Sequence, residues 1–225
     1  MPNWVYNNLT IATSSETGGT IKDVADLVEQ VGRPYTVSHY DYKSKEVKKY
    51  TVEEPEFTFW NIVRPEGEAL EMYDESLTKP SASPYWYDWN IENWGTKWDA
   101  SDVEFQSHGP DHKQYTFRTA WAPPLEALKA LSEQHPNVHI ELEWEEEQGF
   151  GGTFVFRGGE GVETEYYDVP KSHADFVKRG REDECACTWG EADDYGFADC
   201  PTATPKEVDT ETAIGNLATI TATWN

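Results

Sequence analysis

Four glutamates at alternate positions are the side chains best placed to do chemistry. Glu141, Glu143, Glu145 and Glu147 are separated by single residues, and on a β-strand this spacing places their carboxylates on one side, roughly 6.6–7 Å apart. Such carboxylates could hold a divalent cation or perform acid–base catalysis if a second element brought further ligands and a pocket shifted their pKa values. The sequence indicates no such element, and an acidic run is usually a solvated strand face.

A third use of these acids requires no catalysis. Regularly spaced negative charges could imitate a nucleic-acid backbone and occupy the basic groove of a DNA-binding protein, because the same attraction operates in both cases. Between Glu141 and Asp199 the chain has 17 acidic and 5 basic residues. The candidate binding residues are the acids of this region: Glu141, Glu143, Glu145, Glu146, Glu147, Asp183, Glu184, Glu191, Asp193 and Asp194.

A zinc site is the other candidate. His173, Cys185, Cys187 and Cys200 offer one imidazole and three thiolates, a set that zinc accepts. The Cys-x-Cys spacing is tighter than in usual zinc sites, so we expect reduced thiols and no cofactor, with zinc as the alternative. Nor do we expect catalytic residues, because the adjacent Ser–His pairs and the glycine runs lack the context of a nucleophile or a phosphate loop.

The composition limits the classes of partner. The 225 residues include 18 basic and 42 acidic side chains, a formal net charge of −24, which repels phosphate backbones and anionic membranes. We therefore expect no direct binding to nucleic acid or membrane, although acidity alone also keeps a protein soluble. An odd number of cysteines, three, indicates a reducing compartment, and no signal peptide is apparent. The expected location is the cytoplasm.

The elements that would position these side chains begin with a βα unit. Residues 5–11 alternate apolar and polar side chains, which predicts a strand. Thr20 and Asp23 have the spacing of a capping box, and an apolar stripe follows before Gly32 ends the helix. Residues 35–52 then predict an inserted hairpin with a lysine-rich turn.

Residues 85–98 contain four tryptophans and two tyrosines, rings that each bury roughly 150–250 Å² when packed. Their spacing predicts a helix that ends at Gly95, with most rings in the core. Further strands are predicted around residues 103–106, 138–144 and 150–156.

A short repeat predicts two strand-to-helix junctions of one design, each with a proline in the first helical turn. Convergence on favourable junction residues would give the same match. The matched residues, 58 positions apart, are Thr58–Phe59, Pro65 and Glu68–Leu70, and Thr116–Phe117, Pro123 and Glu126–Leu128.

Four segments in order resemble one known family: Pro2–Trp4, Asn93–Ala100, Thr119–Pro124 and Glu145–Gly152. They are similar to a family of bacteriophage and plasmid proteins of unknown function, whose plasmid members include YubB. The resemblance covers roughly residues 1–157 and implies a ferredoxin-like βαββαβ sheet and a mobile-element origin. It implies no activity.

The expected fold class is α+β: a ferredoxin-like antiparallel sheet with helices packed on one face, plus an acidic C-terminal extension. Residues 1–162 would form the ferredoxin-like domain, with the 35–52 hairpin inserted, and residues 163–225 an extension packed on it.

The expected function is that of a phage-encoded, non-catalytic acidic protein in the host cytoplasm. It would inhibit or redirect a host or defence protein with a basic surface, in one version by DNA mimicry. The alternatives are a metal-dependent hydrolase that uses the Glu141–Glu147 carboxylates, and a virion structural component. The sequence leaves the oligomeric state open.

Overall fold

The computed structural model describes residues 3–78, 85–170 and 173–185, and the chain divides into two units, Met1–Val169 and Pro170–Asn225. The elements of the first unit are β1 (Trp4–Thr13), α1 (Ile21–Val31), β2 (Tyr35–Asp41), β3 (Glu46–Val52), the 3-10 helix η1 (Phe59–Asn61), α2 (Glu68–Leu77), α3 (Tyr85–Trp94), β4 (Ser101–Ser107), β5 (His112–Ala120), α4 (Leu125–Gln134), β6 (Val138–Glu146), β7 (Gly151–Arg157) and β8 (Glu160–Tyr167). The second unit contains α5 (His173–Lys178) and η2 (Glu182–Glu184).

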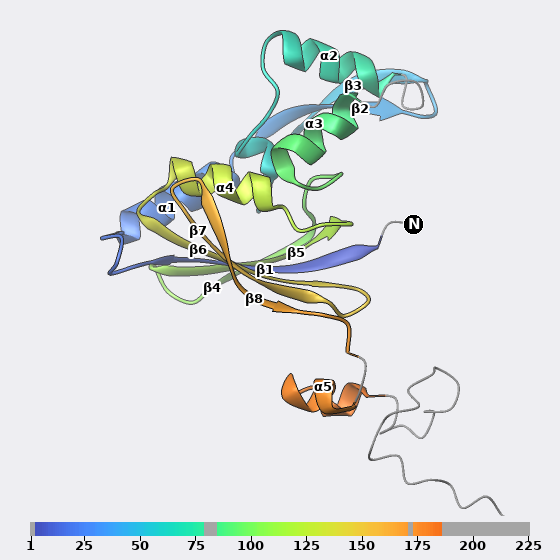
Figure 1. Ribbon diagram of the computed structural model, residues 1–225. Coiled ribbons are helices and arrows are strands. Elements are labelled where there is room, and N and C mark those ends of the chain that lie inside the picture. The colour runs from blue at the N-terminus through green and yellow to red at the C-terminus, as the bar shows by residue number, and fades with distance from the viewer. Residues whose placement is uncertain (1–2, 79–84, 171–172, 186–225) are drawn as a thin grey trace, which may run out of the picture. The chain divides into compact units, whose positions relative to one another are not determined.

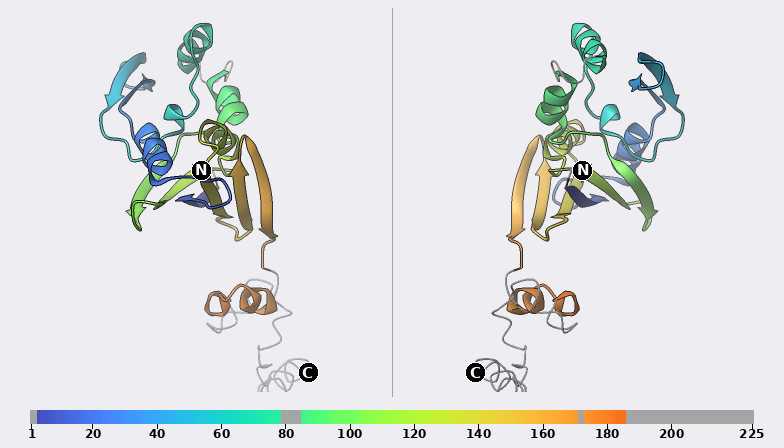
Figure 2. Two further views of the ribbon diagram at one scale, coloured as in Figure 1. Left: turned by 90° about the vertical axis from the view of Figure 1, so that its left-hand side faces the viewer. Right: turned by 90° about the vertical axis from the view of Figure 1, so that its right-hand side faces the viewer.

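An antiparallel sheet of order β4-β5-β1-β6-β7-β8 forms the body of the first unit (Figure 1). With α1 after β1 and α4 between β5 and β6, the strands β1, β4, β5 and β6 have ferredoxin-like βαββαβ connectivity, and β7 and β8 widen the sheet beyond β6. Both helices lie on one face of the sheet (Figure 2). The predicted α+β fold, with a ferredoxin-like antiparallel sheet, is confirmed.

The core lies between this sheet and its helices. Along β1, Val5, Leu9 and Ile11 are fully buried, because every second side chain of a strand points to the same face. Rings fill one part of the core: the Phe57 and Phe117 centroids are 5.2 Å apart in a stacked pair. Burying one large apolar side chain in this way stabilises the fold by about 1.5–3 kcal/mol.

The tryptophan-rich segment is a helix, as its spacing predicts. Helix α3 ends at Trp94, and the next residue, Gly95, has a φ of +82°, a left-handed conformation that glycine adopts without strain. Trp94 is 2 % exposed, whereas Trp98 is 37 % exposed. The rings are therefore divided between the core and the surface.

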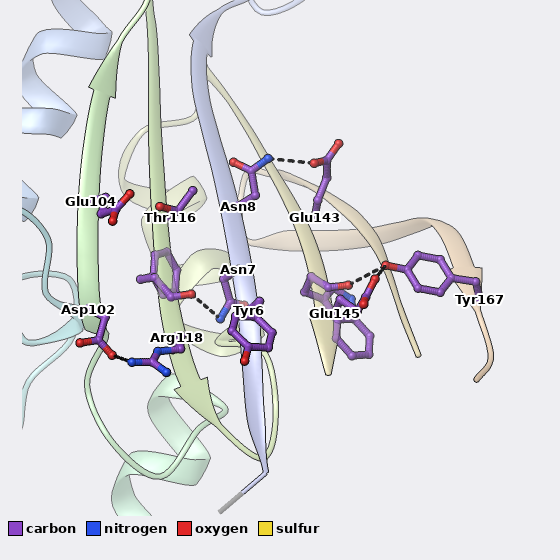
Figure 3. A pocket seen from close by; sticks show the side chains of 12 residues that line it. Tyr6, Asn7, Asn8, Asp102, Glu104, Thr116, Arg118, Glu143, Glu145 and Tyr167 are labelled. Carbon is purple, nitrogen blue, oxygen red and sulfur yellow. Dashed lines mark hydrogen bonds and ion pairs between the residues drawn. The ribbon is translucent and has the colours of Figure 1, made fainter. Parts of the chain in front are cut away.

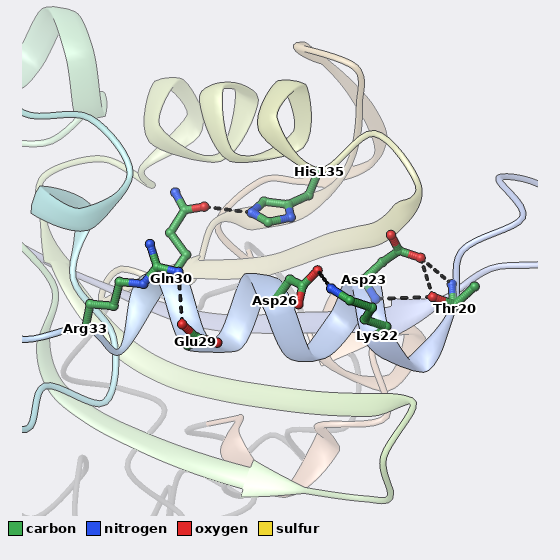
Figure 4. Close-up of polar contacts among 8 residues, drawn as sticks. All are labelled: Thr20, Lys22, Asp23, Asp26, Glu29, Gln30, Arg33 and His135. Carbon is green, nitrogen blue, oxygen red and sulfur yellow. Dashed lines mark hydrogen bonds and ion pairs between the residues drawn. The ribbon is translucent and has the colours of Figure 1, made fainter.

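Helix α1 begins with the predicted capping box (Figure 4). The Thr20 side chain accepts a hydrogen bond from the Asp23 backbone N–H at 3.3 Å, and the Asp23 carboxylate accepts one from the Thr20 N–H at 2.7 Å. Near the other end, Gln30 joins α1 to the end of α4, because its side-chain oxygen lies 2.8 Å from Nε2 of His135. The capping box thus gives two backbone N–H groups at the start of α1 their hydrogen-bond acceptors. The contact between Gln30 and His135 links α1 to α4.

The predicted hairpin is present as β2 and β3, which form a separate two-stranded sheet. The predicted strand at Thr58–Phe59 is wrong. These residues begin η1, where the Thr58 side chain accepts a hydrogen bond from the Trp60 N–H at 3.1 Å. Pro65 also precedes α2 instead of occupying its first turn. The repeat therefore does not mark a duplicated strand-to-helix design.

The last strand of the sheet crosses the predicted domain boundary at residues 162 and 163. Strand β8 pairs with β7, with Val162 opposite Val155 and Glu165 opposite Thr153, and the first unit ends at Val169. That the C-terminal extension packs on the main domain stays a prediction. None of the helices in the described part of the chain has the length and hydropathy of a membrane span.

The His135 link predicts an acid-sensitive contribution to stability. Burial lowers the pKa of the half-buried His135 imidazole below its ordinary value. As the pH falls through the ordinary histidine range, the unfolded chain therefore takes up this proton first, and folding loses stability. We expect the free energy of unfolding of the wild type, relative to His135→Gln, to fall by up to about 1 kcal/mol between neutral pH and pH about 5.5, after allowance for solvent screening.

Urea unfolding at several pH values measures this difference. His112→Gln, which replaces an exposed histidine on β5, is the matched control and leaves the acid-induced loss unchanged. The same pH dependence in His135→Gln as in the wild type would contradict the assignment.

Candidate functional site

The face of the sheet opposite α1 and α4 is the candidate site. In the described part of Met1–Val169, no helix lies on it (Figures 1 and 2). Directly paired residues on antiparallel strands share a face, so the register identifies a row that crosses all six strands. In strand order this row is Glu104, Thr116, Asn8, Glu143, Thr153 and Glu165.

A second row runs beside the first. It contains Arg118, Tyr6, Glu145 and, across β7 from Glu145, Tyr167. The two rows border a hollow of about 550 Å³ that is shown in Figure 3. Tyr6 is 52 % exposed. The central strand β1 therefore presents an aromatic ring between the carboxylates of the neighbouring strands.

Neutral donors hold two of the β6 glutamates. Asn8 donates a hydrogen bond from Nδ2 to Glu143 at 2.9 Å, and Gln114 donates to the Asn8 side-chain oxygen at 2.6 Å. The Tyr167 hydroxyl donates to Glu145 at 3.1 Å (Figure 3). An amide donor orients a carboxylate without cancelling its charge, so the Asn8 contact fixes the negative charge of Glu143 in place on the sheet.

The basic side chains of this face have partners of their own. Arg118 pairs with Asp102, and its guanidinium carbon lies 5.4 Å from the centroid of the Trp4 ring. On β6, Nε2 of His139 lies 3.6 Å from a carboxylate oxygen of Glu141. The face therefore combines acidic, amide and aromatic groups with a minority of basic side chains.

The structure confirms that Glu141, Glu143 and Glu145 share one face of β6, because they pair with Thr10, Asn8 and Tyr6 of β1. Glu147 lies beyond the end of β6, where its carboxylate accepts a hydrogen bond from the Trp4 N–H at 3.1 Å. Asp183 and Glu184 lie in η2 of the second unit. Glu191, Asp193 and Asp194 lie outside the described residues.

The assignment of Glu146 to the binding surface is wrong. This residue is 2 % exposed and pairs with the buried Val5. Its carboxylate accepts hydrogen bonds from the Asn3 side chain and from the Gln148 backbone N–H, both at 2.6 Å. Glu146 therefore holds the start of β1 against the β6–β7 turn, and its even position, shared with the buried Leu142, was the signal for this role.

The proposed zinc ligands are only partly described. His173 lies in α5 and Cys185 is buried, whereas Cys187 and Cys200 lie outside the described residues. Across residues 3–78, 85–170 and 173–185, no three His, Cys, Asp or Glu side chains gather closely enough to hold a metal ion. The zinc site stays a prediction.

Several residues of the open face were missed from the sequence: Tyr6, Asn8, Glu104, Arg118, Glu165 and Tyr167. The alternation of residues 5–11 places Tyr6 and Asn8 on the face away from the core. The other four join them only through the register between strands.

The buried position of Glu146 generates a stability prediction. Glu146→Ala leaves the Asn3 amide and the Gln148 N–H without their acceptor, which costs about 1–3 kcal/mol. The matched exposed change Glu143→Ala alters the free energy of unfolding by less than about 0.5 kcal/mol. Urea unfolding of both variants measures the contrast, and equal losses would contradict the structural role of Glu146.

Comparison with known proteins gives a family match for part of the chain. Residues 93–185 match a family model described as the ferredoxin-like domain in Api92-like protein. A crystal structure of the protein api92 from Yersinia pseudotuberculosis is similar over 76 % of this chain and 100 % of that chain, with 11 % sequence identity and a TM-score of 0.44. No curated protein matches. The bacteriophage and plasmid part of the expected resemblance stays a prediction, and over residues 93–185 this chain is similar to the ferredoxin-like domain of Api92-like proteins.

Proposed function

We propose that this chain is a non-catalytic binding protein whose open sheet face docks onto a basic protein surface. The observation that carries the proposal is an ordered set of carboxylates on that face, called here the acidic face: Glu104, Glu141, Glu143, Glu145 and Glu165. Three of the five lie in a single row across the sheet.

The backbone of the sheet sets the spacing of these charges. Neighbouring strands lie about 4.7–4.9 Å apart, so Glu143 and Glu165, two strands apart, are separated by roughly 10 Å at their backbones. Along β6 the repeat is roughly 6.6–7 Å. A basic groove that attracts the phosphates of DNA would be attracted to such an array by the same long-range field.

The finer version of the proposal concerns the partner and the setting. We propose that the chain is phage-encoded and that it inhibits or redirects a host or defence protein in the host cytoplasm by imitating DNA. The formal net charge of −24 supports a basic partner, because opposite fields accelerate association. The resemblance of four sequence segments to phage and plasmid proteins supports the setting.

The alternative functions have less support from the described residues. A hydrolase that used the Glu141–Glu147 carboxylates would need them to converge on one metal ion or substrate. Glu146 is instead buried, and the Glu147 carboxylate accepts a hydrogen bond from the Trp4 N–H. Glu141, Glu143 and Glu145 all lie on β6, and among the described residues no second element brings further ligands near enough to complete a metal site. No observation favours a virion component.

Charge reversal on the acidic face tests the proposal. The variant Glu141→Lys/Glu143→Lys/Glu145→Lys should lose capture of the partner from a bacterial host lysate, because each change removes an attraction and adds a repulsion. Capture on the immobilised full chain, followed by mass spectrometry, identifies the partner. Its binding to the wild type should weaken steeply with added salt.

A control variant separates this face from net charge. Glu29→Lys/Glu66→Lys/Glu71→Lys reverses three exposed acids elsewhere in the first unit and changes the net charge equally. It should retain capture. Equal losses in both triple variants, or binding that does not change with salt, would overturn the proposal.

A further inference from the structure

A second cavity lies between the β2–β3 hairpin and the helices α2 and α3. Its volume is about 290 Å³, close to the lower end of the range for ligand pockets, about 300–1,000 Å³. Nine of the fifteen residues that line it are tyrosines or tryptophans. We call this cavity the aromatic cleft. None of the residues that line it belongs to the acidic face.

The deep wall of the aromatic cleft is made of well-packed rings. The Trp60 centroid lies 5.6 Å from that of Tyr73, with 65° between the ring planes, and 6.3 Å from that of Trp94, with 70° between the planes. These three side chains are only 2–6 % exposed. At these distances and angles Trp60 is in edge-to-face contact with the other two rings, so a ligand in the cleft meets only the parts of these rings that line it.

The rim is open to solvent. Tyr42 and Tyr50 of the hairpin segment also line the cleft and are 76 % and 48 % exposed. On the hairpin, Lys48 pairs with Asp41, and Lys49 lies 3.7 Å from Asp74. A ligand that enters over the rim therefore meets phenol rings beside lysines that already have acidic partners.

The charges that line the cleft favour a cation. Among the residues that the structure describes, its lining includes one carboxylate, Asp99, and one histidine, His39, but no lysine or arginine. The faces of aromatic rings carry partial negative charge and attract cations. Burial raises the pKa of the Asp99 carboxyl above its ordinary value, although hydrogen bonds from Thr58 and from the Phe59 and Ala100 N–H groups oppose that shift.

The hydrogen bonds inside the cleft select the kind of cation. The Asn90 side chain accepts a hydrogen bond from the Tyr73 hydroxyl at 3.1 Å and donates one to the Lys97 carbonyl at 2.8 Å, and Asp99 already accepts three. A primary ammonium or a guanidinium brings three to five N–H donors, and the Asn90 and Asp99 oxygens in the cleft already accept hydrogen bonds. A fully N-methylated ammonium has no donor to satisfy, and its methyl groups pack on rings.

We propose that the aromatic cleft binds a quaternary ammonium group, held by the rings of Trp60, Tyr73 and Trp94 and by the rim tyrosines. Choline is the probe. Its two comparators are the carbon isostere, in which a tert-butyl group replaces the trimethylammonium, and ethanolamine, which has a primary ammonium. Titration of the full chain by calorimetry, with tryptophan fluorescence in parallel, should show choline binding at least about tenfold more tightly than either comparator.

Variants at the rim locate the site. Tyr50→Ala should weaken choline binding at least about threefold, and Tyr50→Phe should preserve it because the ring face remains. Tyr166→Ala is the matched control, since it removes a tyrosine that is 57 % exposed on β8. Circular dichroism confirms that each variant is folded.

Three results would overturn the proposal: no saturable binding of choline, equal affinity for choline and its carbon isostere, or an unchanged affinity in Tyr50→Ala. A peptide with one trimethyllysine, compared with its unmethylated form, identifies the source of the ligand. Tighter binding of the methylated peptide than of choline assigns the site to a protein tail, and the reverse order assigns it to a free metabolite.

Discussion

The two-residue alternation of the central strand β1 is the constraint on which the rest of the structure depends. Its odd-numbered side chains, including Val5, Leu9 and Ile11, are buried, so α1 and α4 can pack only on that face. A slip of one residue against β5 or β6 would exchange the two faces. Asn7 opposes such a slip, because its buried amide donates a hydrogen bond to the Thr119 side chain at 3.0 Å.

The same register creates the acidic face. Glu143 stands opposite Asn8 because Leu142 stands opposite Leu9, and the burial of both leucines fixes that pairing. The segment between α1 and β4 is attached differently, since it adds no strand to the main sheet. Asp99 binds the start of η1, and ring contacts join η1 to β5, with the centroids of Phe59 and Phe117 5.9 Å apart. Because side chains, and not strand pairing, attach this segment to the main sheet, the aromatic cleft is lined mostly by rings.

The sequence predicts elements well where one signal is local and strong. The capping box, the helix before Gly95 and the alternating strands are of this kind. The predicted strand at Thr58 is wrong because the hydrogen-bond partner of this residue, Asp99, lies 41 positions away and no local pattern indicates it. The sequence misses β8, since an edge strand exposed on most of its length has no apolar alternation to detect. The β6 glutamates of the acidic face can be predicted from the sequence. Glu104 and Glu165 join them only through the register between strands, which no local sequence pattern contains.

The order of the acidic face bears on its role. Solubility requires charge but no fixed arrangement of carboxylates, and freely rotating glutamates would serve it equally well. Here Asn8, itself bonded to Gln114, holds Glu143, and Tyr167 holds Glu145. Side chains already held in one conformation lose less entropy when a partner binds, commonly about 0.5–1.5 kcal/mol for each one that need not be immobilised. The amide donor on Glu143 also leaves the charge of that carboxylate uncancelled, which suits the recognition of a basic surface.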